Sequence, residues 1–87
     1  MDKTYDLVMV DWEDSTCRSG WHKPEFAPKF PDQCVTVGFI LRRDPKSITL
    51  AQSLCEDRSV DGSWLIPRVN IRKIQILIKV KAPKAKE

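Results

Sequence analysis

The sequence contains none of the long apolar runs and few of the residues that mark specialised classes of protein. No apolar stretch approaches the ~20 residues that a transmembrane helix needs. The first residues, MDKTYD, lack the basic-then-apolar order of a signal peptide. We therefore expect a cytoplasmic protein.

Cysteine and histidine are scarce. The three cysteines, Cys17, Cys34 and Cys55, form no CxxC pair, and their odd number does not suit a disulfide framework. Together with His22 they could be written as a zinc site, but structural zinc sites usually take their ligands from close pairs of residues. The sequence therefore predicts reduced thiols, no metal site and no cofactor.

What the sequence does contain fits one small globular domain. Its 87 residues are 41% hydrophobic and 31% charged, the composition of an ordered chain with one modest core. The charge is uneven, since residues 1–67 carry 8 basic and 11 acidic side chains whereas residues 68–87 carry 7 and 1. We predict a single domain over residues 1–80 and a flexible basic tail over residues 81–87.

The dominant period of the apolar residues is two, which indicates strands with one buried face. In the first strand Val8, Val10 and Trp12 alternate with Leu7 and Met9. Glycine and three prolines then interrupt the chain for about twenty residues, which predicts a long loop without a long helix.

The middle of the chain predicts a bent hairpin. Residues 34–43 alternate around Gly38, and a glycine within a strand commonly marks a bulge or a sharp bend. Asp44 followed by a proline favours a turn, so residues 47–55 should return antiparallel to their predecessor. Asp61 followed by glycine predicts the next tight turn.

Two short strands complete the predicted fold. The first covers residues 63–67, and the second covers residues 68–80, with dense isoleucine that favours a strand over the alternative of a helix at residues 68–79. The sequence thus predicts an all-β fold, a small five-stranded barrel that is closed or nearly closed, with a long loop after the first strand. Two sets of residues belong to this prediction: a core with Trp12, Phe39, Trp64 and the isoleucines, and one shared face with Ile74, Ile76, Ile78 and Val80.

Half of the chain resembles a known family. The stretches VTVGFILRRDPKSITLAQSL and WLIPRVNIRKIQIL resemble the Sm-like (SH3-like) small β-barrel, the family that includes a bacterial RNA chaperone. The order VDWEDS, GW, VGFILRRD, ITLAQS, LIPRVNIRKI is also similar to short proteins of tailed phages and prophages. The resemblance implies a homo-oligomer formed by pairing of barrel edges. It also places Arg68, Asn70 and Arg72 where the family contacts a base or a phosphate.

Residues around the long loop and the strand ends are candidates for nucleotide binding. Trp12 and Trp21 could stack on a base. Asp14 and Ser15 could hydrogen-bond base edges or ribose hydroxyls, and Arg43, like Arg68 and Arg72, could form a fork onto phosphate. Each candidate has a structural alternative: Trp12 in the core, Trp21 as an anchor of the loop, Asp14 and Ser15 as caps of its first turn, and Arg43 as solvated charge at a hairpin tip.

Catalytic motifs are missing from the sequence. Ser15, Cys17 and His22 lie close together, but spacing alone does not give the geometry of nucleophilic catalysis. We predict a non-catalytic protein that binds a small nucleotide and, if it is phage-encoded, acts in the host cytoplasm by sequestering a nucleotide signal of host immunity. The alternatives are an Sm-like RNA-binding ring and a module that binds or inhibits a host protein.

Overall fold

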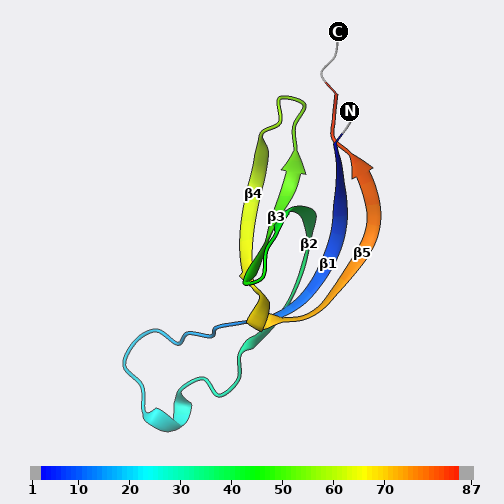
Figure 1. The fold of residues 1–87 in the computed structure, drawn as a ribbon. Coiled ribbons are helices and arrows are strands. Elements are labelled where there is room, and N and C mark those ends of the chain that lie inside the picture. The colour runs from blue at the N-terminus through cyan, green and yellow to red at the C-terminus, as the bar shows by residue number, and fades with distance from the viewer. Residues whose placement is uncertain (1–2, 85–87) are drawn as a thin grey trace.

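The computed structural model describes residues 3–84 and consists of strands, two short 3-10 turns and a long loop (Figure 1). The strands are β1 (Thr4–Asp14), β2 (Asp32–Arg43), β3 (Ser47–Leu54), β4 (Val60–Pro67) and β5 (Ile71–Lys81), and the 3-10 turns are η1 (Pro24–Phe26) and η2 (Arg68–Asn70). The strands form one antiparallel sheet in the order β4-β3-β2-β1-β5. The prediction of an all-β, five-stranded fold is confirmed, and the alternative of a helix at residues 68–79 is wrong apart from the single turn η2.

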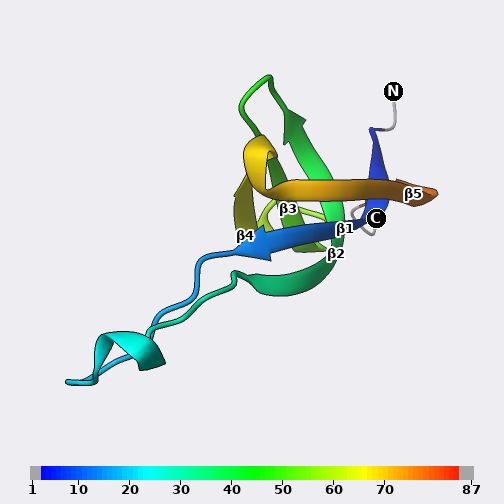
Figure 2. The same ribbon diagram turned by 90° about the horizontal axis from the view of Figure 1, so that it is seen from below.

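The sheet curls strongly without closing. Strands β4 and β5 are its two edges, and no hydrogen-bonded ladder joins them, so the predicted barrel is not closed by hydrogen bonds. The curl is nevertheless deep enough to give one core, because Val8 of β1 packs in the same cluster as Ile48 of β3 and Ile66 of β4. Figure 2 shows β3 and β4 folded around one side of β1 and β2.

Gly38 lies at a close approach of β2 and β3. A Cβ atom at this position would stand 2.9 Å from the carbonyl oxygen of Ala51 and 3.2 Å from Cβ of Leu50. Only glycine allows this approach without a shift of the backbone. The bend predicted at Gly38 therefore corresponds to a real close contact between β2 and β3.

A bulge in β5 overturns one predicted face. Val8 pairs with Ile76, but its neighbour Leu7 pairs with Ile78, so Leu77 is an extra residue between the two pairs. Paired residues of antiparallel strands point to the same side of the sheet. The prediction that Ile74, Ile76, Ile78 and Val80 share one face is therefore wrong, since the last two lie on the opposite face from the first two.

The turn between β3 and β4 lies earlier than predicted. Cys55 and Ser59 close it through a hydrogen bond of 2.9 Å from the Cys55 amide to the Ser59 carbonyl. Asp61 and Gly62 are instead inside β4, where Gly62 has φ +66 opposite the side chain of Gln52. The tight turn predicted from Asp61 and Gly62 is wrong, because the glycine accommodates an irregularity within the strand.

The core is smaller than the sequence suggests. Trp12 is buried as predicted, Phe39 is half-buried, and Trp64 is 47% exposed, so the assignment of Trp64 to the core is wrong.

At the end of the chain Lys81 still belongs to β5, and the Ala82 amide donates to the Lys3 carbonyl at 2.8 Å. Residues 85–87 of the predicted tail lie outside the described residues. Within residues 3–84 no helix is long and apolar enough to cross a membrane.

Candidate functional site

Trp12 is a structural residue of the core. Only 7% of its surface is exposed, and its indole Nε1 donates a hydrogen bond of 2.9 Å to Oγ1 of Thr36 on the neighbouring strand. The indole packs with Val8 and Val10, its alternating neighbours in β1. Trp12 therefore follows its structural alternative, because a ring enclosed in this way presents no free face to a base.

Asp14 and Ser15 mark the point where β1 ends and the long loop begins. The Asp14 carboxylate accepts a hydrogen bond of 2.8 Å from the amide of Ser15, so the acid stabilises the first bend of the loop. The Ser15 hydroxyl is exposed, and no hydrogen bond of this group occurs within residues 3–84. Of this pair, Ser15 is the group open to a ligand.

The loop of residues 15–31, which we call the arm, extends away from the sheet (Figure 1). The arm contributes to a longest dimension of 62 Å, against 24 and 20 Å along the other two axes. A few internal contacts shape it: Thr16 donates to the carbonyl of Phe30, and Arg18 donates to the carbonyl of Phe26. Trp21 has an exposed fraction of 106%, so it does not anchor the arm to the body.

Two of the three candidate arginines are held in ion pairs within the sheet. Arg72 forms a bidentate ion pair with Glu13, in which Nε and Nη2 lie 3.0 Å and 2.6 Å from Oε1 and Oε2 of the carboxylate. Arg43 reaches Asp6 at 2.7 Å. These guanidinium groups lower the pKa of Glu13 and of Asp6 below their ordinary values, chiefly through side-chain hydrogen bonds. Both arginines join strands that are distant in sequence.

Arg68 differs from the other two candidate arginines. Its amide donates to the carbonyl of Lys46 at 2.9 Å, and its Nε donates to the carbonyl of Asp44 at 2.7 Å. Both terminal nitrogens of the guanidinium are without a partner within the described part of the chain. Arg68 is thus fixed in place while the fork that recognises phosphate remains open.

The remaining candidate, Asn70, ends the turn η2 and is partly buried. Its segment lies beside the end of β1, because Trp12 pairs with Ile71 and Glu13 binds Arg72. Trp12, Asp14, Ser15, Arg68, Asn70 and Arg72 therefore come from the same end of the sheet. Two candidates do not join them: Trp21 is carried away by the arm, and Arg43 points to Asp6.

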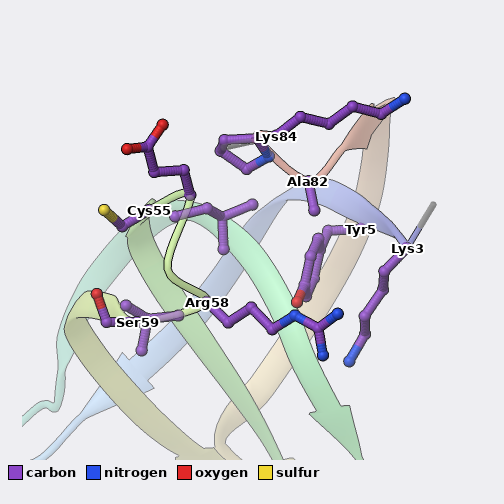
Figure 3. Close-up of a pocket in the computed structure, with 11 residues that line it drawn as sticks. Lys3, Tyr5, Cys55, Arg58, Ser59, Ala82 and Lys84 are labelled. Atoms are coloured by element: carbon purple, nitrogen blue, oxygen red, sulfur yellow. The ribbon is translucent and has the colours of Figure 1, made fainter. Parts of the chain in front are cut away.

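A cavity of about 620 Å³ at another place was missed from the sequence (Figure 3). It lies between the β3–β4 turn and the two chain ends, and its lining includes Lys3, Tyr5, Cys55, Arg58, Ser59 and Lys84. Lys3 places Nζ 5.1 Å from the centre of the Tyr5 ring. No motif predicts this site, because residues far apart in the sequence meet only after the sheet has curled.

The potentially reactive side chains are dispersed. Cys17 and Cys55 are exposed, Cys34 is partly buried against the core, and all three are free thiols. His22 bonds through Nδ1 to the carbonyl of Gly20 at 2.9 Å. Among the described residues, no hydrogen bond joins His22 to Ser15 or Cys17, and no group of three potential metal ligands occurs.

Comparison with known proteins gives no family for this chain. No family model, no curated protein and no solved structure matches it.

Proposed function

We propose that this protein is a non-catalytic, Sm-like barrel protein that assembles with copies of itself and binds a small nucleotide at the end of the sheet where Arg68 lies. The Sm-like assignment is supported by the five strands, the bend at Gly38 and the single core within a curled sheet. The observation that carries the nucleotide proposal is the open fork of Arg68.

The two sheet edges support self-assembly. An edge strand presents unpaired backbone groups, and a long apolar edge is a template for another chain. On β4, Trp64 and Leu65 are 47% and 64% exposed, and on β5, Ile76 and Ile78 are 55% and 58% exposed. Pairing of β5 from one copy with β4 from the next would cover both edges. A contact of this head-to-tail kind closes into a ring when the rotation between copies permits it.

The end of the sheet near Arg68 offers the polar groups that a nucleotide requires. The guanidinium of Arg68 binds a phosphate, while Ser15 and Asn70 supply short polar side chains for the sugar or the base edge. The arm extends away from the sheet, as Figure 1 shows, and Trp21 within it is fully exposed. In an assembly the arm would bring this ring to a ligand held by a neighbouring copy. Each site then uses residues from two copies.

Binding without a catalytic group has a simple consequence: the nucleotide is withdrawn from solution and is not consumed. In the phage setting implied by the sequence resemblance, this is the chemistry needed to sequester a nucleotide signal of host immunity. In that setting the protein acts in the host cytoplasm, without membrane attachment.

The test combines mass and ligand-induced stabilisation. Native mass spectrometry reads the number of copies, and thermal unfolding with a panel of cyclic and linear di- and trinucleotides reads binding. Arg68→Ala should clearly reduce the rise in melting temperature caused by the bound nucleotide but leave the assembly intact. Arg42→Ala is the matched control, because Arg42 is an exposed arginine that is not among the proposed ligand contacts. A monomer, or equal stabilisation of the Arg68→Ala variant and the parent, would overturn the proposal.

A second candidate function, binding to a host protein, is favoured by one observation. Trp21 is fully exposed in the arm, and tryptophan is a frequent anchor residue of protein interfaces.

The RNA-binding alternative receives less support, because Arg72 and Lys79 from the basic C-terminal segment are already paired with Glu13 and Asp6. Binding to RNA would depend steeply on salt concentration.

A further inference from the structure

The cavity beside the β3–β4 turn has the size of a small-molecule site. Its volume of about 620 Å³ lies within the usual range of about 300–1,000 Å³ for ligand pockets. Figure 3 shows the side chain of Arg58 extending from the turn toward Tyr5 and Lys3. Two cationic side chains and an aromatic ring thus converge on one hollow.

Lys3 and Arg58 line the cavity without forming an ion pair in the part of the chain that the structure describes. Within residues 3–84 the ion pairs use the carboxylates of Asp6 and Glu13, and neither Lys3 nor Arg58 takes part in one. Glu56 also lines the cavity but forms no ion pair with either cation. A phosphate group bound in this cavity would be attracted by both positive charges. The arrangement is therefore better suited to a bound anion than to an empty cavity.

Arg58 also has an unusual backbone conformation. It is the one non-glycine residue with positive φ in the described part of the chain, at φ 71. A left-handed conformation is unfavourable for a residue with a Cβ atom and is normally given to glycine. The turn holds Arg58 there through the bonds from its amide to Cys55 and from the Cys55 amide to Ser59. Strained backbone positions cluster at ligand-binding and active sites, so this conformation supports a role for the Arg58 side chain.

Asp57 reinforces the same turn. Its carboxylate accepts hydrogen bonds from both the hydroxyl and the amide of Ser59, at 2.5 and 2.9 Å. These bonds, the one from the hydroxyl first, lower the pKa of Asp57 below its ordinary value. The Asp57 carboxylate is thus occupied by Ser59 and leaves the guanidinium of Arg58 available.

We propose that this cavity binds the phosphate group of a small molecule no larger than a nucleotide, through Lys3 and Arg58. Tyr5 supplies a flat wall and a phenol beside the anion. The site is separate from the one at Arg68 and does not depend on it, because the two sites use different turns of the sheet.

The first experiment compares three probes by isothermal titration calorimetry and by amide NMR shifts. Adenosine 5′-monophosphate should bind saturably and shift the amides of residues 3–5 and 55–60, whereas adenosine should not bind. Inorganic phosphate separates the two sources of the chemistry: binding as tight as that of the nucleotide identifies the free ion as the ligand, and weaker binding identifies a phosphate ester. Equal affinity for adenosine and its monophosphate, or no binding by either phosphate probe tighter than about 1 mM, would overturn the proposal.

The decisive variant is Arg58→Gly, which removes the guanidinium and relieves the strained backbone in one step. Affinity for the phosphate probe should fall at least about tenfold, as expected for the loss of a charge-assisted hydrogen bond. The melting temperature should rise, because glycine adopts positive φ freely. Unchanged affinity in this variant would show that Arg58 does not bind the anion.

Further variants separate this site from the rest of the molecule. Lys3→Gln should also weaken binding at least about tenfold, and it decides the question if Arg58→Gly fails to fold. Lys23→Gln, which removes an exposed lysine of the arm, is the matched control and should leave binding unchanged. Arg68→Ala removes the nucleotide site proposed above and should leave the amide shifts of residues 3–5 and 55–60 unchanged, so failure of one proposal is distinguishable from failure of the other. Equal losses in all of these variants would indicate nonspecific attraction to positive charge and would overturn the site.

Discussion

The curled sheet and the arm are built on opposite principles. Val8, Val10, Ile48 and Ile66 are completely buried within the sheet, whereas no residue of the arm at 15–31 is buried. The sheet gains its free energy of folding from removal of apolar surface from water, and the arm gains almost none. Aromatic rings that do not stabilise the fold, such as Trp21, are therefore available for contacts with another molecule.

The largest effect should come from Trp12→Ala within the sheet. The variant leaves a cavity and removes the indole donor from Thr36, so the free energy of unfolding should fall by about 3–5 kcal/mol. Urea denaturation followed by circular dichroism measures the loss. Trp64→Ala is the matched control, because a half-exposed tryptophan should cost clearly less. A loss below about 1 kcal/mol at Trp12 would contradict its place in the core.

A smaller effect is expected from Gly38→Ala, at the close approach of the paired strands β2 and β3. The new methyl group would lie 2.9 Å from the backbone oxygen of Ala51, which cannot move as freely as a side chain. The free energy of unfolding should fall by about 1–3 kcal/mol. Ser19→Ala in the arm is the comparison, because Ser19 is an exposed residue of the arm. A loss at Ser19 as large as that at Gly38 would remove the distinction between sheet and arm.

The sequence predicted the parts of the fold that depend on local pattern. Alternation gave the first strand with Trp12 inside, and Gly38 marked the bend. The bulge at Leu77 and the exposure of Trp64 could not be predicted, because both depend on register and on how far the sheet curls. Whether β4 and β5 pair to close the sheet likewise depends on the three-dimensional fold, and in the described strands they do not pair.

The candidate site was predictable only in part for the same reason. As arginines, Arg43, Arg68 and Arg72 were equal candidates for binding phosphate in the sequence. Only the structure shows that Arg43 and Arg72 form ion pairs with acids. The cavity of Lys3 and Arg58 combines the N-terminal strand with a turn far along the chain, and the positive φ of Arg58 has no sequence signature. Contacts between distant segments decide which charged residues remain free.

Acid should weaken the sheet through Asp6, which binds Arg43 of β2 and Lys79 of β5. Hydrogen bonds from Arg43 and then Lys79 lower the pKa of Asp6 from its ordinary value of 3.8. The stabilisation is therefore present above that value and is lost as the pH falls through the lowered one. Asp6→Asn should lower the melting temperature at neutral pH and reduce the further loss between about pH 5 and pH 2. Glu25→Gln in the arm is the control. If Asp6→Asn loses as much melting temperature between about pH 5 and pH 2 as the parent does, Asp6 does not provide this link between strands.

The smallest change in stability should follow Trp21→Ala, although it deletes the same side chain as Trp12→Ala. Its ring contacts no part of the core, so the free energy of unfolding should stay within about 0.5 kcal/mol of the parent. The nucleotide-induced rise in melting temperature should nevertheless shrink, because the proposed ligand site takes this ring from a neighbouring copy. A loss of stability without ligand would show that the arm folds back onto the body. Unchanged stability and unchanged nucleotide binding would instead leave the exposed ring to a protein partner.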